Sequence, residues 1–383
     1  MKSKIWLSSP HIGTNELKYV NEAFETNWIS PLGPNVNAFE IALQAQTKTL
    51  HAAALSSGTS AIHLALILLG VSTNDTVFCQ SITFSASANP IAYQGAKPVF
   101  IDSEPDTWNM DPILLRKALQ EAKDVGKLPK AIIPVHLYGM PAKMNDILAI
   151  AKEFNVPVIE DAAEALGTNI QDSPCGSFGT FGVLSFNGNK IITTSGGGAL
   201  LSNDAVMIEK ARFLATQARD SAPHYQHSEI GYNYRMSNVL AGIGRGQLEV
   251  LNDRVTARRN NFFRYKSYFS KWNLEGFNIQ FQEEPEGYYS NRWLTCILVD
   301  PTSNKGLTSE EIRLAMDLEN IETRPLWKPM HQQPVFATSK NYLNGVSDML
   351  FKNGLCLPSG SNLTDDEFSR IFKCLDTIFS KHR

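Results

Sequence analysis

The amino-acid sequence predicts an α/β fold with a large domain built on a mainly parallel sheet and a smaller C-terminal α+β domain. Over the first part of the chain, short apolar runs alternate with stretches of helical spacing, which is typical of βαβ units. After about residue 237, long helical runs replace this alternation. The length of 383 residues is enough for two or three domains of about 150 residues each.

The strands are predicted where apolar or β-branched residues form short runs. These runs span residues 52–55, 76–79, 98–101, 131–135, 157–159 and 181–186. Apolar periodicity and end signals predict helices over 14–24, 60–69, 111–122, 143–154 and 204–215. Because helical stretches separate the strands, we expect the strands to run parallel in one sheet.

The C-terminal part is predicted from longer elements. A helical run covers 238–268, a strand-like run covers 293–299, and a helix lies near 309–320. Thr364 and Glu367 match a capping box that opens a closing helix. We therefore expect a large domain over 1–250 and a small domain over 251–383.

The composition indicates a compact protein without a polyanionic partner. The chain has 35 basic and 38 acidic residues, a net charge of -3, and 43% hydrophobic residues. This balance supplies no field that would attract nucleic acid or an anionic membrane. The longest apolar stretch, over 61–71, falls short of the roughly 20 residues that cross a bilayer. The first residues hold too short an apolar run for a signal peptide, so we expect a soluble, cytoplasmic protein.

The cysteines and short motifs exclude several chemistries. The five cysteines have no pair two residues apart, so neither a disulfide framework nor a metal site is predicted, and buried thiols are expected. The chain also lacks G-x-G-x-x-G, Walker A, G-x-S-x-G and H-E-x-x-H patterns. The sequence therefore has no motif that would indicate a nicotinamide-binding, P-loop, serine hydrolase or zincin function.

Polar residues instead gather where predicted strands end, which is where open α/β sheets build their sites. Ser57, Gly58 and Thr59 open a helix directly after a strand, an arrangement that suits a phosphate, although this motif alone favours a simple capped turn. Phe84 follows the next strand and could stack on a flat ring, although a core phenylalanine is the alternative.

Two carboxylates and a lysine complete this set. The run EDAAE at 160–164 brings Asp161 and Glu164 to the end of a buried strand, where ionised carboxylates need partners. An N-cap is the alternative for Asp161 but leaves Glu164 unexplained. Lys190 follows Ser185 and precedes a three-glycine turn at 196–198. A phosphate cradle, a stacking aromatic, a carboxylate for a ring nitrogen and a primary amine together suit pyridoxal 5'-phosphate (PLP).

The order and spacing of these motifs resemble the sugar-nucleotide aminotransferases of the DegT family. The resemblance is carried by WISPLG at 28–33, SGTS at 57–60, EDAAE at 160–164, the segment 185–198, GYNYRMS at 231–237 and RPLW at 324–327. It covers essentially the whole chain. It implies a fold type I PLP-dependent transferase like aspartate aminotransferase, assembled as a homodimer with shared active sites.

The resemblance also implies residue roles. Lys190 would bond covalently to PLP, and Asp161 would pair with the pyridinium nitrogen. Ser185 and the Gly58-Thr59 turn would hold the phosphate, joined by Asn233 from the partner subunit. Glu164 stands where some members place Gln or His beside the phenolic oxygen of PLP, so it is expected to share a proton there or to make contact through water.

Substrate contacts are expected from Asn187, Arg324 and His331. Arginine suits a diphosphate or a donor carboxylate, although a surface ion pair is the alternative for Arg324 and His331.

The presence of Lys190 disfavours the family's dehydratase branch. The resemblance implies transfer of an amino group from L-glutamate to C4 of a UDP-linked 2-acetamido-4-keto-2,6-dideoxyhexose for cell-surface glycans such as lipopolysaccharide O-antigen, or for glycoproteins. GDP-4-keto-6-deoxymannose, the perosamine precursor, is the alternative substrate. A PLP-binding regulator without turnover is the alternative of another class.

Overall fold

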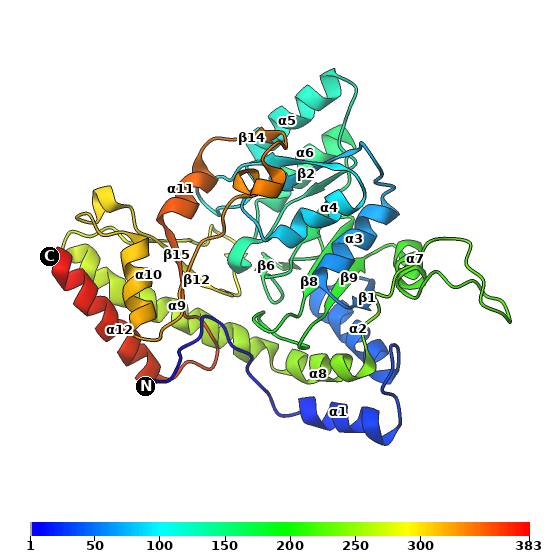
Figure 1. Ribbon diagram of the computed structural model, residues 1–383, viewed down its shortest axis with the longest axis horizontal. Helices are drawn as coiled ribbons and strands as arrows, with labels where there is room; N and C mark the ends of the chain where they lie inside the picture. Colours follow the sequence, from blue (N-terminus) through cyan, green and yellow to red (C-terminus); the bar gives the residue numbers. More distant parts are fainter. Residues whose placement is uncertain (1) are drawn as a thin grey trace.

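The computed structural model describes residues 2–383, which fold around one central sheet (Figure 1). The strand orders β14-β3-β2-β4 and β1-β9-β8-β5 are joined by parallel bridges between β4 and β5, namely Ile132 with Val158 and Val135 with Asp161. The strands are β1 (His51–Leu55), β2 (Thr76–Gln80), β3 (Lys97–Ile101), β4 (Ala131–Ile133), β5 (Ile159–Asp161), β8 (Phe181–Ser185), β9 (Gly198–Ser202) and β14 (Asn341–Tyr342).

Neighbouring strands of this sheet are parallel except at β9, which is antiparallel to both β1 and β8. The predicted mainly parallel sheet is therefore confirmed. Parallel strands end at a common edge, so the loops after β1, β2, β5 and β8 can gather around one site.

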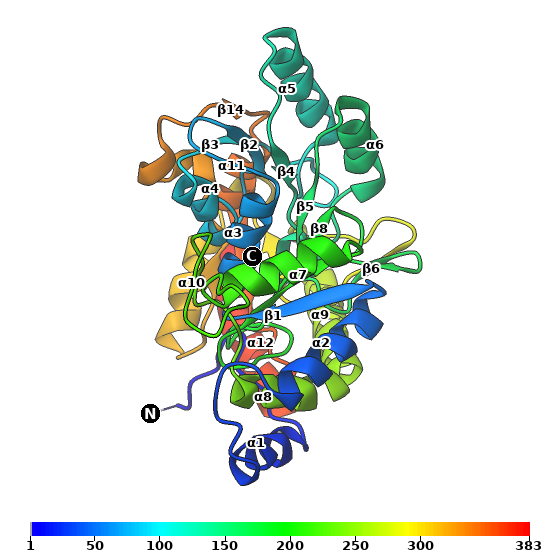
Figure 2. The same cartoon turned by 90° about the vertical axis from the view of Figure 1, so that its right-hand side faces the viewer.

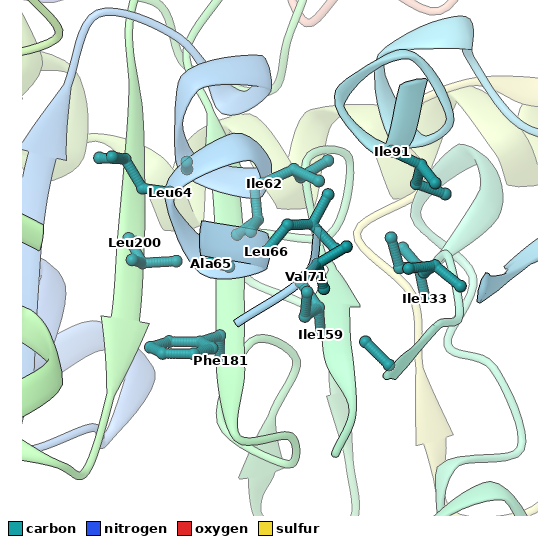
Figure 3. Packing of buried hydrophobic residues seen from close by; sticks show 14 of the residues in the cluster. Ile62, Leu64, Ala65, Leu66, Val71, Ile91, Ile133, Ile159, Phe181 and Leu200 are labelled. Atoms are coloured by element: carbon teal, nitrogen blue, oxygen red, sulfur yellow. The ribbon is translucent and has the colours of Figure 1, made fainter. Parts of the chain in front are cut away.

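Helices cover both faces of the sheet. One face packs against α3 (Gly58–Leu68), α4 (Asn89–Tyr93) and α7 (Ala205–Ala215), and Figure 3 shows the apolar contacts of α3. The other face packs against α2 (Pro34–Thr47), α5 (Pro112–Asp124), α6 (Met144–Phe154) and α8 (Asn238–Glu249). Figure 2 shows α2 and α7 on opposite sides of β1. Along β1, Ala53 and Leu55 join the first core while Ala52 and Ala54 join the second, as the two-residue period of a strand requires.

A separate apolar core lies in the C-terminal part. It is formed by α9 (Leu251–Leu274), α10 (Ser309–Leu318) and α12 (Asp365–Phe379) with a sheet of β10 (Gln280–Phe281), β12 (Thr295–Leu298), β15 (Gly354–Leu357) and β13 (Arg324–Pro325). Ile5 from the N-terminal segment is buried in the same core. The remaining longer elements are α1 (Glu16–Glu25), α11 (Val346–Asn353), β6 (Asn169–Ile170), β7 (Ser173–Pro174) and β11 (Tyr288–Tyr289). The predicted boundary at 250/251 falls between α8 and α9 and stays a prediction.

Most predicted elements are confirmed, with shifted ends. Thr364 and Glu367 form the expected capping box on α12, and the five cysteines are buried free thiols. The strand predicted over 157–159 instead spans Ile159–Asp161. The helix α2 is absent from the predicted elements, because its buried face includes the polar side chain of Glu40, which weakens the apolar periodicity. Within residues 2–383, no helix is both long and apolar enough to cross a membrane.

Candidate active site

A cavity of about 630 Å³ opens at the carboxyl edge of the central sheet. Ten of the twelve residues proposed above line it: Ser57, Gly58, Thr59, Phe84, Asp161, Glu164, Ser185, Asn187, Lys190 and Arg324. They come from the carboxyl ends of β5 and β8, from the segments that follow β1, β2, β5 and β8, and from β13. The two that do not line it are Asn233 and His331.

The start of α3 forms a small cradle at one end of this cavity. The Ser57 hydroxyl caps the helix by accepting a hydrogen bond from the Ser60 amide at 3.0 Å. A Cβ atom at Gly58 would lie 3.2 Å from the Ser185 Cβ and 3.3 Å from the Leu184 carbonyl, so glycine lets β8 approach the helix closely. The first amides of a helix attract anions. This cradle therefore fits a phosphate group as well as providing the capped turn.

Asp161 is a buried carboxylate without a basic partner. Its Oδ2 accepts a hydrogen bond from the Ser87 hydroxyl at 2.6 Å and its Oδ1 accepts one from the Ala163 amide at 3.1 Å. It is only 5% exposed, and no ion pair within residues 2–383 includes it. Burial of an unpaired carboxylate is costly. A pyridinium nitrogen in the cavity would supply the missing positive charge.

Lys190 and Glu164 form an ion pair on the cavity wall. The Lys190 Nζ lies 3.2 Å from the Glu164 Oε1 and 4.2 Å from the centre of the Trp293 indole ring. The Glu164 Oε2 accepts a hydrogen bond from the Tyr138 amide at 2.7 Å. Burial raises the pKa of Glu164 to about 7, against the opposing effect of Lys190. Glu164 can therefore hold or release a proton beside the lysine amine near neutral pH.

Phe84, an aromatic residue of the cavity wall, is not packed into a hydrophobic core. Phe84 is 57% exposed, which excludes the alternative of a core phenylalanine. Its ring lies 5.6 Å from the Trp327 ring at a tilt of 51°. Trp327 also lines the cavity, within the RPLW segment noted in the sequence. Stacking of Phe84 on a ligand ring stays a prediction.

The proposed substrate residues divide into two groups. Arg324 lies at the cavity wall with an exposed guanidinium group, 2.8 Å from Glu322. His331 lies away from the cavity lining, where its ring nitrogens contact the Ser81 hydroxyl at 2.7 Å and Asp348 at 2.9 Å. These contacts hold the turn after β2, so a substrate role for His331 has no support from this chain's cavity.

Asn233 does not line the cavity of its own chain. It is exposed, although Arg235 two residues later is buried against Glu40 at 2.8 Å. Its backbone forms a bridge with Thr216. This placement leaves Asn233 available to another subunit.

Glu160 has a structural role that the sequence did not reveal. It is fully buried and accepts hydrogen bonds from the Gly176 amide at 2.7 Å and the Phe178 amide at 2.9 Å. His136 Nε2 lies 2.7 Å from it, and with Cys175 they form a group of potential metal ligands. The His136 Nδ1 accepts the Ala142 amide hydrogen at 3.0 Å, so Nε2 carries a hydrogen and donates it to Glu160. Both ring nitrogens are therefore engaged without a metal ion.

Sequence reasoning missed three contributors to the site. Ser87 binds Asp161, Trp293 lies beside the lysine amine, and Ser8 lines the cavity from the N-terminal segment. Of these, only Ser87 had a local signal, since it closely follows Phe84 in a polar loop after a strand. Ser8 and Trp293 are too distant in sequence to be associated with Lys190 by pattern.

Comparison with known proteins decides the family. Residues 10–376 match the DegT/DnrJ/EryC1/StrS aminotransferase family. The chain belongs to this family. It is 55% identical to EpsN of Bacillus subtilis (strain 168), whose name describes a pyridoxal phosphate-dependent aminotransferase, over 99% of this chain and 97% of that protein. It is 35% identical to the GDP-perosamine synthase of Escherichia coli O157:H7, over 97% of both chains.

The solved structures agree with this assignment. Spr1654 of Streptococcus pneumoniae, described as a sugar aminotransferase and solved in its PLP form, covers 100% of both chains with a TM-score of 0.88 at 26% identity. The fold is therefore fold type I, and the protein is a PLP-dependent sugar aminotransferase, as the resemblance implied. Bound PLP supplies an electron sink for the reaction. The cavity residues fit this cofactor, because the α3 cradle, the unpaired Asp161 and the Lys190 amine match its phosphate, ring nitrogen and aldehyde.

Proposed function

We propose that the protein transfers the amino group of L-glutamate to C4 of a nucleotide-linked 4-keto-6-deoxy sugar, with a UDP-linked 2-acetamido-4-keto-2,6-dideoxyhexose as the preferred substrate. The observation that carries the proposal is the joint placement of the Lys190 amine and the buried carboxylates Asp161 and Glu164 on one cavity wall. A PLP-binding regulator has no need of a lysine amine held 3.2 Å from a carboxylate whose pKa is about 7.

Each of these residues has a distinct role in the proposal. Lys190 would hold the cofactor through its aldehyde carbon, and the Lys190 Nζ would move the proton at the substrate carbon that carries the nitrogen. Asp161 would keep the ring nitrogen of the cofactor protonated, and the Ser87 hydroxyl orients the Asp161 Oδ2. Glu164 accepts or returns a proton at Nζ through its Oε1. Ser57, Ser185 and the first amides of α3 bind the phosphate.

The choice of nucleotide rests on the sequence. The segment 185–190 and the WISPLG segment resemble enzymes that act on UDP-linked acetamido sugars. A GDP-linked 4-keto-6-deoxymannose is the second candidate, favoured by the 35% identity to a GDP-perosamine synthase. Either product would supply cell-surface glycan synthesis in the cytoplasm.

A homodimer with shared active sites is part of the proposal. Asn233 is exposed and does not line its own chain's cavity, which suits a contact with the phosphate bound by a second subunit. Large apolar side chains nearby in sequence are also exposed, with Ile230 at 84% and Tyr225 at 79%. Figure 1 shows the chain after α7 projecting from the body of the molecule. Such a projecting apolar segment is typical of a subunit interface.

The test combines a half-reaction and a substrate panel. PLP-loaded protein mixed with L-glutamate alone is expected to release 2-oxoglutarate and leave pyridoxamine phosphate, while the Lys190→Ala variant releases none. UDP- and GDP-linked keto sugars are then added separately, and the products are identified by mass. Absence of 2-oxoglutarate from the wild-type reaction would overturn the transamination, whereas amination of the GDP sugar alone would overturn only the preference for UDP.

A further inference from the structure

A buried arginine without a carboxylate partner lies two hydrogen bonds away from the lysine loop, which is the segment 186–197 between β8 and β9. Arg258 on α9 is 1% exposed, and no ion pair within residues 2–383 includes it. Burial lowers its pKa to about 9. Its Nη1 donates to the Trp293 carbonyl at 2.5 Å and to the Ser359 carbonyl at 3.2 Å, and its Nη2 donates to the Ser8 hydroxyl at 2.9 Å. Burial of a charge that contacts only neutral oxygens is costly. We therefore assign the role of Arg258 to the groups that it orients.

Two of those groups converge on one carbonyl. The Ser8 hydroxyl and the Trp293 indole N–H each donate a hydrogen bond of 2.7 Å to the carbonyl of Asn189, the residue before Lys190. The Ser8 oxygen accepts from Arg258, which directs its own hydrogen toward Asn189. The same Trp293 ring lies 4.2 Å from the Lys190 Nζ.

The N-terminal segment that carries Ser8 is itself anchored. Ile5 forms a parallel bridge with Ile321, and the Leu7 amide donates to Glu322 at 3.1 Å. The Leu7 carbonyl accepts the Ser359 amide hydrogen at 2.8 Å. Leu7 and Ser8 both line the cavity. The segment is therefore a fixed wall of the site.

We infer that Arg258, Ser8 and Trp293 are positioning residues that hold the backbone before Lys190, so that the lysine amine meets the cofactor's aldehyde carbon in a reactive geometry. The inference rests on the proposed role of Lys190. Arg258 acts through Ser8 and Trp293, and these two act through the Asn189 carbonyl. Loss of one donor leaves the carbonyl bound by the other, whereas loss of both frees the loop.

The expected effects follow from this arrangement. Ser8→Ala or Trp293→Phe each removes one hydrogen bond and is expected to slow covalent capture of PLP about fivefold. Trp293→Phe keeps an aromatic ring beside Nζ, so it removes only the donor. The double variant leaves the carbonyl without a donor and is expected to slow capture about a hundredfold, more than the product of the single effects. Ser8→Thr keeps the hydroxyl and is expected to restore the wild-type rate.

The experiment compares binding with bond formation. Pyridoxamine phosphate lacks the aldehyde, so its dissociation constant reports the cavity alone, while the absorbance change after mixing apo-protein with PLP reports bond formation with Lys190. The matched control is Arg254→Gln, since Arg254 lies one turn earlier on α9 and holds His11 and Ile12 of the same segment. This control is expected to leave the capture rate within twofold of wild type.

The outcomes are distinct. Slower capture with unchanged affinity for pyridoxamine phosphate supports the inference. Unchanged capture in the double variant overturns the inference, because it shows that these residues have no role in capture. Equal losses of capture rate and of affinity, together with a lower urea midpoint, also overturn it, because they show a merely structural role. Failure of the wild-type protein to capture PLP on Lys190 would instead overturn the proposed role of Lys190, and the inference with it.

Discussion

The pair formed by Glu164 and Lys190 makes a quantitative prediction about stability against pH. Burial raises the pKa of Glu164 from 4.5 to about 7. The folded state therefore favours the protonated acid, and the unfolded state binds fewer protons between these values. The resulting contribution is fully present below pH 4.5 and is lost as the pH rises through about 7. The shift corresponds to about 3 kcal/mol of unfolding free energy.

The perturbation is Glu164→Gln, which keeps an oxygen for the Tyr138 amide and removes the titration. Urea unfolding of the two apo-proteins between pH 4 and pH 8 measures the difference. The wild-type protein is expected to lose about 3 kcal/mol relative to the variant across this range. As a control, Glu283→Gln removes an exposed partner of Lys266 and should change the unfolding free energy by less than about 1 kcal/mol.

Parallel stability curves for wild type and Glu164→Gln would refute the reasoning, because they would mean that Glu164 titrates alike in both states. A difference that grows in the opposite direction would show that the attraction of Lys190 outweighs burial. In that case the carboxylate would be ionised throughout and could not return a proton at neutral pH.

Three further predictions concern activity and assembly. Lys190→Ala is expected to bind PLP without the absorbance band of a lysine bond and to have no measurable turnover, checked by spectroscopy and product mass. Asp161→Asn should keep the fold but slow turnover by about two to four orders of magnitude, whereas Ser87→Ala should cost only about tenfold, and wild-type rates in Asp161→Asn would identify a mere helix cap. Mixed dimers of Lys190→Ala and Asn233→Asp, each inactive alone, should recover about a quarter of wild-type activity. About half of the dimers are hybrids, and each hybrid has one site with both lesions and one intact site. No recovery despite demonstrated subunit exchange would contradict the shared site.

The sequence predicted the class of fold and the edge at which the site lies. Alternating apolar and helical runs predict a parallel sheet, and in such a sheet the residues after each strand meet at one edge. Ser57, Phe84, Asp161 and Lys190 accordingly line one cavity although they are spread over more than a hundred residues. Local pattern suffices for this, because strand periodicity and chain direction determine the edge.

The sequence did not distinguish neighbouring polar residues with different tasks. Glu160 and Asp161 are adjacent, yet Glu160 points to the opposite face and binds the amides of Gly176 and Phe178. His331, expected at the substrate, contacts Ser81 and Asp348 and does not line the cavity of its own chain. Residue type alone cannot show which partners satisfy a buried polar group.

Only the tertiary structure decided the electrostatics around Lys190. The pKa of Glu164 depends on burial among elements that are far apart in the chain. Likewise, Ser8 and Trp293 reach the Asn189 carbonyl from the N-terminal segment and from the residues before β12, and Arg258 on α9 contacts both of them. Such contacts carry no periodic signal, since they depend on how the C-terminal elements pack against the central sheet. The sequence by itself determined which groups could perform the chemistry, and packing determined their charges and positions.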